Sequence, residues 1–252
     1  MNIYTRNLDR IEFVVTMGCT GKCRHCSEGS HAFAGEHIDG ETAAKAVTEV
    51  CRHYDIKSLM TFGGEPLLFP ETVCMIHNAA AKTGIKQRDI ITNGFFSNDR
   101  QRIREVAGML AESGVNRIML SVDAFHQETI PLEPVEHFAE CVRETGVFIE
   151  LHPAWLVSAD DGDPYNARTR ELLGIFADNG FSADSGNDIF PKGSALKYLS
   201  EYFDGDNIQS DPYEEDPEDI RSLCFDADGS VLGGNIYSSD IMDIIEAYTA
   251  VK

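Results

Sequence analysis

Apolar runs and helix-like segments alternate along most of the chain. Short apolar runs that predict strands lie at residues 11–16, 58–62, 89–92, 117–122, 147–152 and 188–190. Segments with apolar residues at helical spacing lie at residues 40–53, 70–83, 98–113, 134–145 and 165–179. Because each strand–helix–strand crossover returns the chain to the same direction, this order predicts an α/β fold with a parallel sheet, either open or curled into a partial barrel.

The pattern changes after about residue 205. An acidic stretch with two prolines occupies residues 211–219 and is typical of a loop or linker. Residues 223–225 and 230–232, on either side of a turn, predict a β-hairpin, and residues 239–251 predict a final helix. We therefore expect a core of residues 1–205, followed by an acidic linker and a short C-terminal extension in residues 206–252.

Composition limits the class of protein. The chain has 252 residues, of which 42% are hydrophobic, and this is enough for one sizeable core. No apolar run reaches the length of a membrane span and the N-terminus lacks an apolar signal core, so we expect a cytoplasmic protein without membrane contact. Seven cysteines in such a chain favour metal or redox chemistry over a disulfide framework.

The formal net charge of −21 narrows the choice of partner. Repulsion between this charge and phosphates disfavours non-specific binding to nucleic acid. The charge is compatible with a basic substrate or partner, such as a cationic peptide. It is also compatible with a role in solubility or in a salty cytoplasm.

Three cysteines follow the first predicted strand at C-x3-C-x2-C spacing, namely Cys19, Cys23 and Cys26. Thiolates this close in sequence can hold a metal centre. Structural metal sites are closed whereas chemically active ones keep one position free, so three ligands predict a site with an open position. The alternative is a zinc site completed by His25 or His31, as in a zinc-binding interaction module.

Polar residues also collect where the other predicted strands end. The second strand runs into residues 63–66 (Gly-Gly-Glu-Pro), and the third runs into residues 92–94 (Thr-Asn-Gly). Polar residues after the fourth and within the fifth strand are Ser121, Asp123, His126, Glu150 and His152. Because the carboxyl ends of parallel strands meet at one edge of a sheet, these segments predict a single site there.

Taken together, these motifs resemble the radical SAM superfamily. The cysteine spacing is similar to its cluster-binding loop, residues 63–66 to its GGEP element, and residues 92–94 to its third-strand element. Ser121 and Asp123 resemble a ribose-contacting element on the fourth strand. Residues 191–195 are similar to a P-x-G-R-A segment, in which serine here replaces the arginine. The resemblance covers residues 11 to about 200 and implies a partial (β/α)6 barrel.

The resemblance implies one 4Fe–4S cluster, with Cys19, Cys23 and Cys26 binding three irons and S-adenosylmethionine (SAM) chelating the fourth. An electron from a low-potential donor such as flavodoxin or ferredoxin would cleave SAM to methionine and a 5′-deoxyadenosyl radical, which abstracts a hydrogen atom from the substrate. Such an enzyme would work in an anaerobic or reducing cytosol. The SAM contacts that the resemblance implies are Gly63, Gly64, Glu65, Pro66, Thr92, Asn93, Ser121, Asp123 and His25.

Individual roles follow from the same resemblance. Gly63 and Gly64 would let the backbone approach the methionine end of SAM, and Glu65 would help to bind its amino group. Ser121 and Asp123 would hydrogen-bond the ribose hydroxyls. Asn93 offers both a donor and an acceptor. His25 stands where a larger aromatic residue usually covers the adenine.

Cys224 begins a segment that is similar to the start of the SPASM or twitch extensions of radical SAM enzymes. Those extensions bind auxiliary clusters through several cysteines, whereas residues 233–236 (Gly-Gly-Asn-Ile) stand where a later cysteine would be expected. We therefore expect a degenerate extension without an auxiliary cluster. Cys224 is then either a structural thiol or a hydrogen-atom donor to a substrate radical. The other catalytic candidates are His126, His152 and Glu150, with no acid or base role assigned.

The motifs do not specify the substrate. A ribosomally made peptide is the first candidate, since SPASM-like relatives often modify such peptides. A small molecule in cofactor or lipid metabolism is the second. A glycyl-radical activase is disfavoured, because the extra ferredoxin-like cysteines of that group are absent from the sequence.

Overall fold

The computed structural model describes residues 2–29, 35–203 and 214–250. The main sheet consists of β1 (Arg10–Thr16), β2 (Ser58–Gly63), β3 (Gln87–Thr92), β4 (Arg117–Leu120), β5 (Phe148–Leu151) and β8 (Ser222–Phe225). These six strands are parallel and lie in the order β5–β4–β3–β2–β1–β8. The prediction of an α/β fold with a parallel sheet is confirmed.

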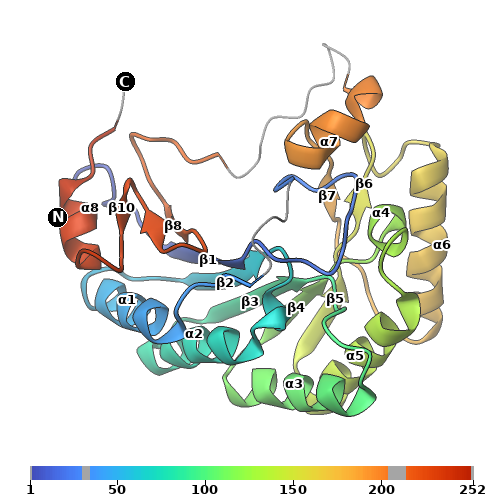
Figure 1. Cartoon of the computed structure of the whole chain (residues 1–252), viewed down its shortest axis with the longest axis horizontal. Coiled ribbons are helices and arrows are strands. Elements are labelled where there is room, and N and C mark those ends of the chain that lie inside the picture. The colour runs from blue at the N-terminus through green and yellow to red at the C-terminus, as the bar shows by residue number, and fades with distance from the viewer. Residues whose placement is uncertain (1, 30–34, 204–213, 251–252) are drawn as a thin grey trace.

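The connecting helices lie where the periodicity predicts them. They are α1 (Gly40–His53), α2 (Pro70–Thr83), α3 (Arg100–Glu112), α5 (Leu132–Thr145) and α6 (Pro164–Asp178), with short helices α4 (Ala124–Gln127), α7 (Gly193–Tyr198) and α8 (Ile241–Ala247) and the 3-10 turns η1 (Pro66–Leu68) and η2 (Ser200–Tyr202). Figure 1 shows α1, α2, α3 and α5 along one side of the sheet. Among the described residues, none of the helices combines the length and the apolar character needed to cross a bilayer.

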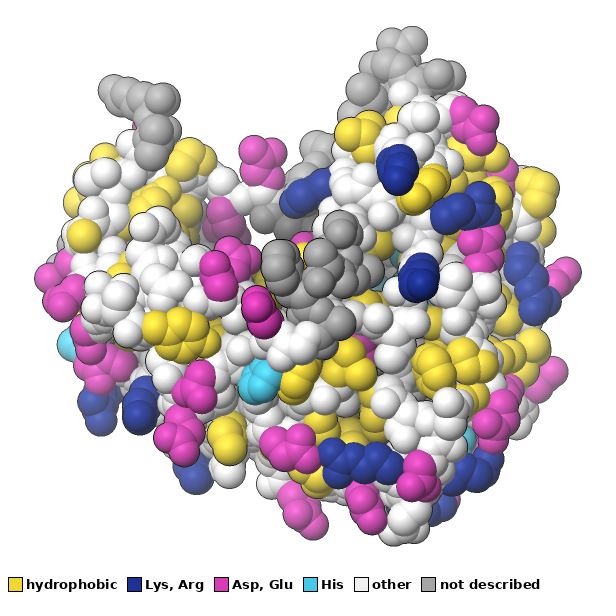
Figure 2. Space-filling view, viewed as in Figure 1, with side chains coloured by type: hydrophobic (Ala, Val, Ile, Leu, Met, Phe, Trp, Pro, Cys, Tyr) yellow, Lys and Arg dark blue, Asp and Glu magenta, His cyan; other side chains and the backbone are white. Residues whose placement is uncertain are grey.

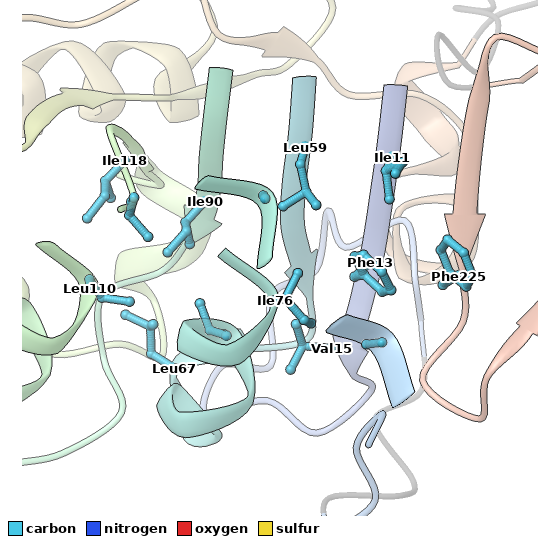
Figure 3. Close-up of a cluster of buried hydrophobic side chains, with 14 of the residues drawn as sticks. Ile11, Phe13, Val15, Leu59, Leu67, Ile76, Ile90, Leu110, Ile118 and Phe225 are labelled. Carbon is cyan, nitrogen blue, oxygen red and sulfur yellow. The ribbon is translucent and has the colours of Figure 1, made fainter. Parts of the chain in front are cut away.

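Strand alternation separates the core from the functional face of the sheet. Ile11 and Phe13 of β1 and Leu59 of β2 are fully buried and pack toward the helices (Figure 3). The intervening residues Glu12 and Val14 point the opposite way and line a cavity. One face of the sheet therefore supplies the hydrophobic core, and the other faces the site.

The C-terminal segment corrects one prediction. Residues 223–225 do not form the first strand of a hairpin but lie in β8, which pairs with β1 in parallel. The physical reason is burial: Leu223 and Phe225 are fully buried, and the Phe225 ring stacks on Phe13 with a centroid distance of 4.6 Å. The hairpin consists instead of β9 (Ser230–Val231) and β10 (Gly234–Asn235). The division of the chain at residue 205 stays a prediction, although β8 lies in the main sheet.

The predicted strand at residues 188–190 is also wrong as a member of the main sheet. On the edge of β5 that faces away from β4, the described residues form a single isolated β-bridge, between Leu151 and Ala183. The short strands β6 (Ala154–Trp155) and β7 (Asn187–Asp188) pair with each other in a separate two-stranded sheet. Residues 182–188 are mostly polar, and Pro153 lacks an N–H for a continuing ladder, so a long strand cannot form here. The sheet's sixth strand comes from the C-terminal segment.

Candidate active site

An open cavity of about 430 Å³ lies at the carboxyl ends of the main strands. Figure 2 shows a hollow between the two lobes of the molecule on this side. The predicted site residues that line it are Cys19, Cys23, Cys26, His25, Gly63, Gly64, Thr92, Asn93, Ser121, Asp123, His126, His152 and Cys224. Glu65, Pro66 and Glu150 are not among its lining residues. Residues that are far apart in the sequence therefore meet in one place, as predicted from the strand ends.

The three cysteines lie in the loop that follows β1, and all three are free thiols that face the cavity. Asn93 Nδ2 lies 3.5 Å from Cys19 Sγ, and the Gly21 amide donates to the same sulfur at 3.3 Å. Burial, together with the nearby Glu65 and Cys26, raises the pKa of Cys19 to about 11, and burial also raises the pKa of Cys23. Metal binding would therefore displace protons from these thiols. Three converging soft ligands fit an iron–sulfur cluster.

The glycine pair after β2 holds the end of this strand against the cysteine loop. The Gly64 amide donates to Thr16 O at 2.7 Å. A Cβ on Gly64 would lie 2.1 Å from Gly18 O, and Gly63 has a φ of 129°, which side chains rarely adopt. Only glycine allows this approach of the two backbones, and both residues still line the cavity.

The Glu65 carboxylate is bound by residues at the ends of β2 and β3. Its carboxylate is fully buried: Oε1 accepts hydrogen bonds from the Leu67 amide and Thr92 Oγ1, and Oε2 accepts from the Asn93 amide. Burial raises the pKa of Glu65 to about 7 despite these hydrogen bonds. These hydrogen bonds join the ends of β2 and β3, next to Pro66, which is also buried. The SAM contacts of Glu65 and Pro66 stay predictions.

Asp123 is likewise occupied by the protein itself. Oδ1 accepts from the Phe125 and His126 amides, both at 2.9 Å, and Oδ2 accepts from the Ala154 amide at 3.2 Å and lies 2.7 Å from His126 Nδ1. The side chain is fully buried. The Asp123 carboxylate thus caps α4 and orients His126, and its contact with the ribose stays a prediction. Ser121 Oγ remains as the polar group of this strand end that faces the cavity.

Comparisons with known proteins agree with this geometry. The family model described as "Radical SAM superfamily" matches residues 13–145, which include the cysteine loop, the glycine pair, Asn93 and Ser121. The chain belongs to the radical SAM superfamily. Radical SAM proteins use a 4Fe–4S cluster and SAM, so the zinc-site alternative is withdrawn; His31, one of its two proposed ligands, lies outside the described residues.

Two sequence relatives illustrate the similarity. GTP 3′,8-cyclase of Lactiplantibacillus plantarum is 27% identical over 124 residues, which are 48% of this chain and 36% of the relative. A probable GTP 3′,8-cyclase of Methanopyrus kandleri is 29% identical over 119 residues, which are 47% of this chain and 35% of the relative. The match thus spans about one third of the length of these curated relatives.

Solved structures share the fold. AdoMet-bound anSMEcpe superposes with a TM-score of 0.62 and 17% identity, over 95% of this chain and 77% of that one. SuiB of Streptococcus suis bound to S-adenosylmethionine gives a TM-score of 0.62 and 14% identity, over 97% and 67% of the two chains. These similarities confirm a partial radical SAM barrel.

His25 and His126 form an aromatic group beside the radical SAM cysteines. The His25 ring lies 4.7 Å from the His126 ring and 5.1 Å from the Phe125 ring, between centroids. Burial lowers the pKa of His25 to about 4, so this ring is neutral near pH 7. His25 Nδ1 is buried without a hydrogen-bond partner. A neutral ring with an unsatisfied nitrogen fits a polar heterocycle such as the adenine of SAM.

The other two radical SAM site candidates have different surroundings. His152 lines the cavity, with Nδ1 2.8 Å from Asp184 Oδ2 and Nε2 2.8 Å from Asn187 Nδ2. Glu150 accepts a hydrogen bond from Arg117 Nε at 2.7 Å and is not among the residues that line the cavity. Glu150 is thus paired with Arg117, and the catalytic roles of Glu150 and His152 stay predictions.

Cys224 faces the radical SAM cavity from β8, directly opposite Glu12 of β1. The residue is exposed toward the open cavity, although the surrounding protein atoms partly desolvate its thiol. Burial, followed by the charges of Glu12, Asp226 and Glu28, raises the pKa of Cys224 to about 12, so the sulfur keeps its proton near pH 7.

Several cavity residues were missed by sequence reasoning. They are the acidic residues Glu12, Glu28, Asp188, Glu215 and Asp226, and the hydroxyl of Ser222. One signal was available, since Glu12 interrupts an otherwise apolar strand and had to point away from the core. The others follow from the position of β8 beside β1, which the sequence pattern did not predict.

Proposed function

We propose that the chain is an enzyme that reductively cleaves SAM and abstracts a hydrogen atom from a substrate bound in this cavity. The observation that supports this most directly is the convergence of Cys19, Cys23 and Cys26 with Gly64, Asn93 and Ser121 around one cavity. When bound, the 4Fe–4S cluster and SAM supply the electron and the 5′-deoxyadenosyl radical.

The protein's own residues divide the remaining work. The three cysteines hold the cluster, and Asn93 Nδ2 donates toward Cys19 Sγ, an interaction that stabilises a thiolate and tunes its cluster. The backbone at Gly63 and Gly64 is open to the methionine end of SAM. Ser121 offers a hydroxyl to the ribose, and His25 offers a neutral ring to the adenine. A low-potential donor such as flavodoxin or ferredoxin supplies the electron.

A peptide is the first substrate class. In support, one fold relative of this chain, anSMEcpe, has been solved with AdoMet and the Cp18Cys peptide, at a TM-score of 0.61 and 17% identity. A wide, open cavity also suits a side chain presented from a longer molecule. The second class is a small molecule, which is favoured by the similarity to GTP 3′,8-cyclases over about half of this chain.

Cys224 is the proposed source of a returning hydrogen atom. Homolysis of its S–H bond and formation of a C–H bond would convert the substrate radical to product and leave a thiyl radical. One electron from the low-potential donor and one proton from solvent would then restore the thiol. The raised pKa of Cys224 keeps the required hydrogen on sulfur near neutral pH.

Anaerobic reconstitution tests the core of the proposal. The protein reconstituted with iron and sulfide should give a 4Fe–4S spectrum and form 5′-deoxyadenosine after reduction with dithionite in the presence of SAM. Alanine at Cys19, Cys23 and Cys26 together should abolish both signals. Alanine at Cys51 and Cys74, which are half-buried in helices outside the cavity, is the matched control and should leave both signals intact. Stoichiometric zinc in the native protein, with no 5′-deoxyadenosine formed, would contradict the proposal.

A further inference from the structure

Carboxylates dominate the part of the cavity wall built by β1, β8 and neighbouring loops. The acidic side chains that line the cavity are Glu12, Glu28, Asp123, Asp188, Glu215 and Asp226, whereas Lys192 is the one lysine or arginine among the described lining residues. Figure 2 shows acidic side chains along one wall of the hollow. Asp123 is neutralised by His126, so the excess of negative charge lies on the other five.

The pairing of β1 with β8 places several of these groups on one stripe. Glu12 is directly opposite Cys224 in the parallel register. Leu223 and Phe225 point into the hydrophobic core, so strand alternation directs Ser222 and Cys224 toward the cavity, and Asp226 continues the stripe. Glu12, Asp226 and Glu28 all lie close enough to Cys224 to influence its ionisation.

Ser222 supplies an independent sign of a ligand. The residue is only 6% exposed and lines the cavity. Ser222 Oγ is close enough to the Glu12 carboxylate to lower the pKa of Glu12, yet no partner reaches this buried oxygen with good hydrogen-bond geometry. Buried hydroxyls normally have a well-aligned partner, and a bound molecule beside Glu12 would supply one.

Among the described residues, little positive charge compensates these carboxylates: Arg10 approaches Glu12 at 2.5 Å, and Lys192 lines the same cavity. Burial nevertheless raises the pKa of Glu12, and burial together with Asp228 raises the pKa of Asp226. Burial alone raises the pKa of Asp188. A cation entering this space would relieve the desolvation and repulsion of these groups, whereas an anion would add to the repulsion.

We propose that the cavity binds its substrate through a cationic nitrogen group, an alkylammonium or a guanidinium. Glu12, Glu28 and Asp226 would hold this group, and Ser222 Oγ would accept a hydrogen bond from one of its N–H groups. This inference rests on the proposed function, because it names the substrate class of the same cavity. The residues proposed for SAM lie on the cysteine loop and at the ends of β2, β3 and β4. The cationic group would therefore lie on the β1–β8 side, next to Cys224.

Ligand binding can be measured without turnover. The reconstituted protein, saturated with SAM so that the positive charges of SAM are already accommodated, would be titrated anaerobically with n-butylammonium and with n-butanol by saturation-transfer NMR. We expect saturable binding of butylammonium and none of butanol. Asp226→Asn should weaken butylammonium binding at least tenfold, and Ser222→Ala should weaken it about threefold. Asp178→Asn, an identical change at an exposed position of α6, should have no effect.

A second titration, with a peptide in place of butylammonium, distinguishes a peptide side chain from a free amine as the source of the cationic group. A pentapeptide with one central lysine that binds at least tenfold more tightly than butylammonium would indicate a peptide side chain, and equal affinities would indicate a free amine. Equal binding of butylammonium and butanol, or equal effects of Asp226→Asn and Asp178→Asn, would overturn the inference. Formation of 5′-deoxyadenosine is measured separately. Its presence without amine binding rejects only this inference, and its absence rejects the proposed function.

Discussion

His126 Nδ1 lies 2.7 Å from Asp123 Oδ2, and the same carboxylate caps the helix that carries His126. The carboxylate thus binds both the backbone amide and the ring Nδ1 of His126. His126 also lines the cavity, and Nε2 is the ring nitrogen that Asp123 does not bind. Burial opposes the charge on Asp123, but His126 outweighs it and lowers the pKa of Asp123, while Asp123 raises the pKa of His126.

Asp123→Asn should separate these two roles. The amide keeps one oxygen for capping but directs an NH₂ group at the Ala154 amide and at His126, so we expect a loss of about 1–3 kcal/mol in the free energy of unfolding. The pKa of His126 should fall, as followed by NMR. Asp39→Asn changes the exposed N-cap of α1, whose side chain accepts from the Thr42 amide, and should cost less than about 1 kcal/mol. Equal losses in the two variants would contradict the role assigned to Asp123.

Gly64→Ala should disrupt the cysteine loop. The new Cβ would meet backbone atoms of Gly18 at 2.1 Å, and backbone cannot move aside as a flexible side chain can. We expect the reconstituted iron content to fall severalfold and 5′-deoxyadenosine formation to fall further. Gly174→Ala in α6, where no atom lies within 4 Å of the added carbon, is the control. It should retain iron and stabilise the protein by up to about 1 kcal/mol.

Phe225→Ala should reveal that β8 belongs to the main core. The fully buried ring stacks on Phe13, so its removal should cost about 3–5 kcal/mol in urea unfolding. Phe148→Ala removes a ring that is 53% exposed and should cost much less. If Phe225→Ala were as mild as Phe148→Ala, β8 would not contribute to the stability of the main core.

Cys224→Ala tests the hydrogen donor. In D₂O the thiol exchanges to S–D, so the wild-type protein should place solvent deuterium in its product. The variant should still bind iron and form 5′-deoxyadenosine but should lose deuterium incorporation. Cys51→Ala changes a cysteine of α1 outside the cavity and should behave as wild type. Unchanged product and unchanged deuterium content in Cys224→Ala would leave Cys224 as a structural thiol.

His77 makes the stability of the fold sensitive to acid. Burial lowers the pKa of this ring to about 3, and its Nε2 lies 3.0 Å from Thr61 Oγ1. Between about pH 6.5 and 3 the unfolded chain therefore binds a proton that the folded chain does not, so stability falls as the pH falls below about 6.5. At pH 5 the loss is about 2 kcal/mol.

His77→Gln should reduce this acid-dependent loss, measured as the difference between unfolding free energies at pH 7 and pH 5. His53→Gln, at an exposed site on α1, should keep the full difference. Comparing variants is necessary because Glu65 has the opposite effect: its raised pKa means that the folded state binds the extra proton, so its contribution falls as the pH rises from about 4.5 to 7. If the difference between the unfolding free energies at pH 7 and pH 5 were unchanged in His77→Gln, His77 would not be the cause of the acid-dependent loss of stability.

Local sequence predicted the parts of this molecule that depend on local physics. The helices follow from periodicity and end at glycines such as Gly84, which adopts the left-handed conformation. The convergence of the cysteines with Asn93 and Ser121 follows from parallel strands sharing an edge. The hydrogen bonds accepted by the Asp123 and Glu65 carboxylates could not be predicted from the sequence, because many of the donors are backbone amides whose positions depend on the folded turns.

Long-range pairing was the other limit. The short apolar run of residues 222–225 is compatible with a hairpin or with a sheet edge, and only packing against Phe13 selects the edge. The same pairing forms one wall of the cavity, since it brings Ser222 and Cys224 opposite β1. Because the sequence pattern did not predict the position of β8, it also did not predict that Glu12 and Asp226 line this wall together.

The pairing of Arg10 with Ser222 also has a consequence for biosynthesis. The first strand of the sheet cannot acquire this neighbour until residues 222–225 have been synthesised, because β8 lies far from β1 in the sequence. Until then the edge of β1 that β8 covers in the folded chain has no partner strand.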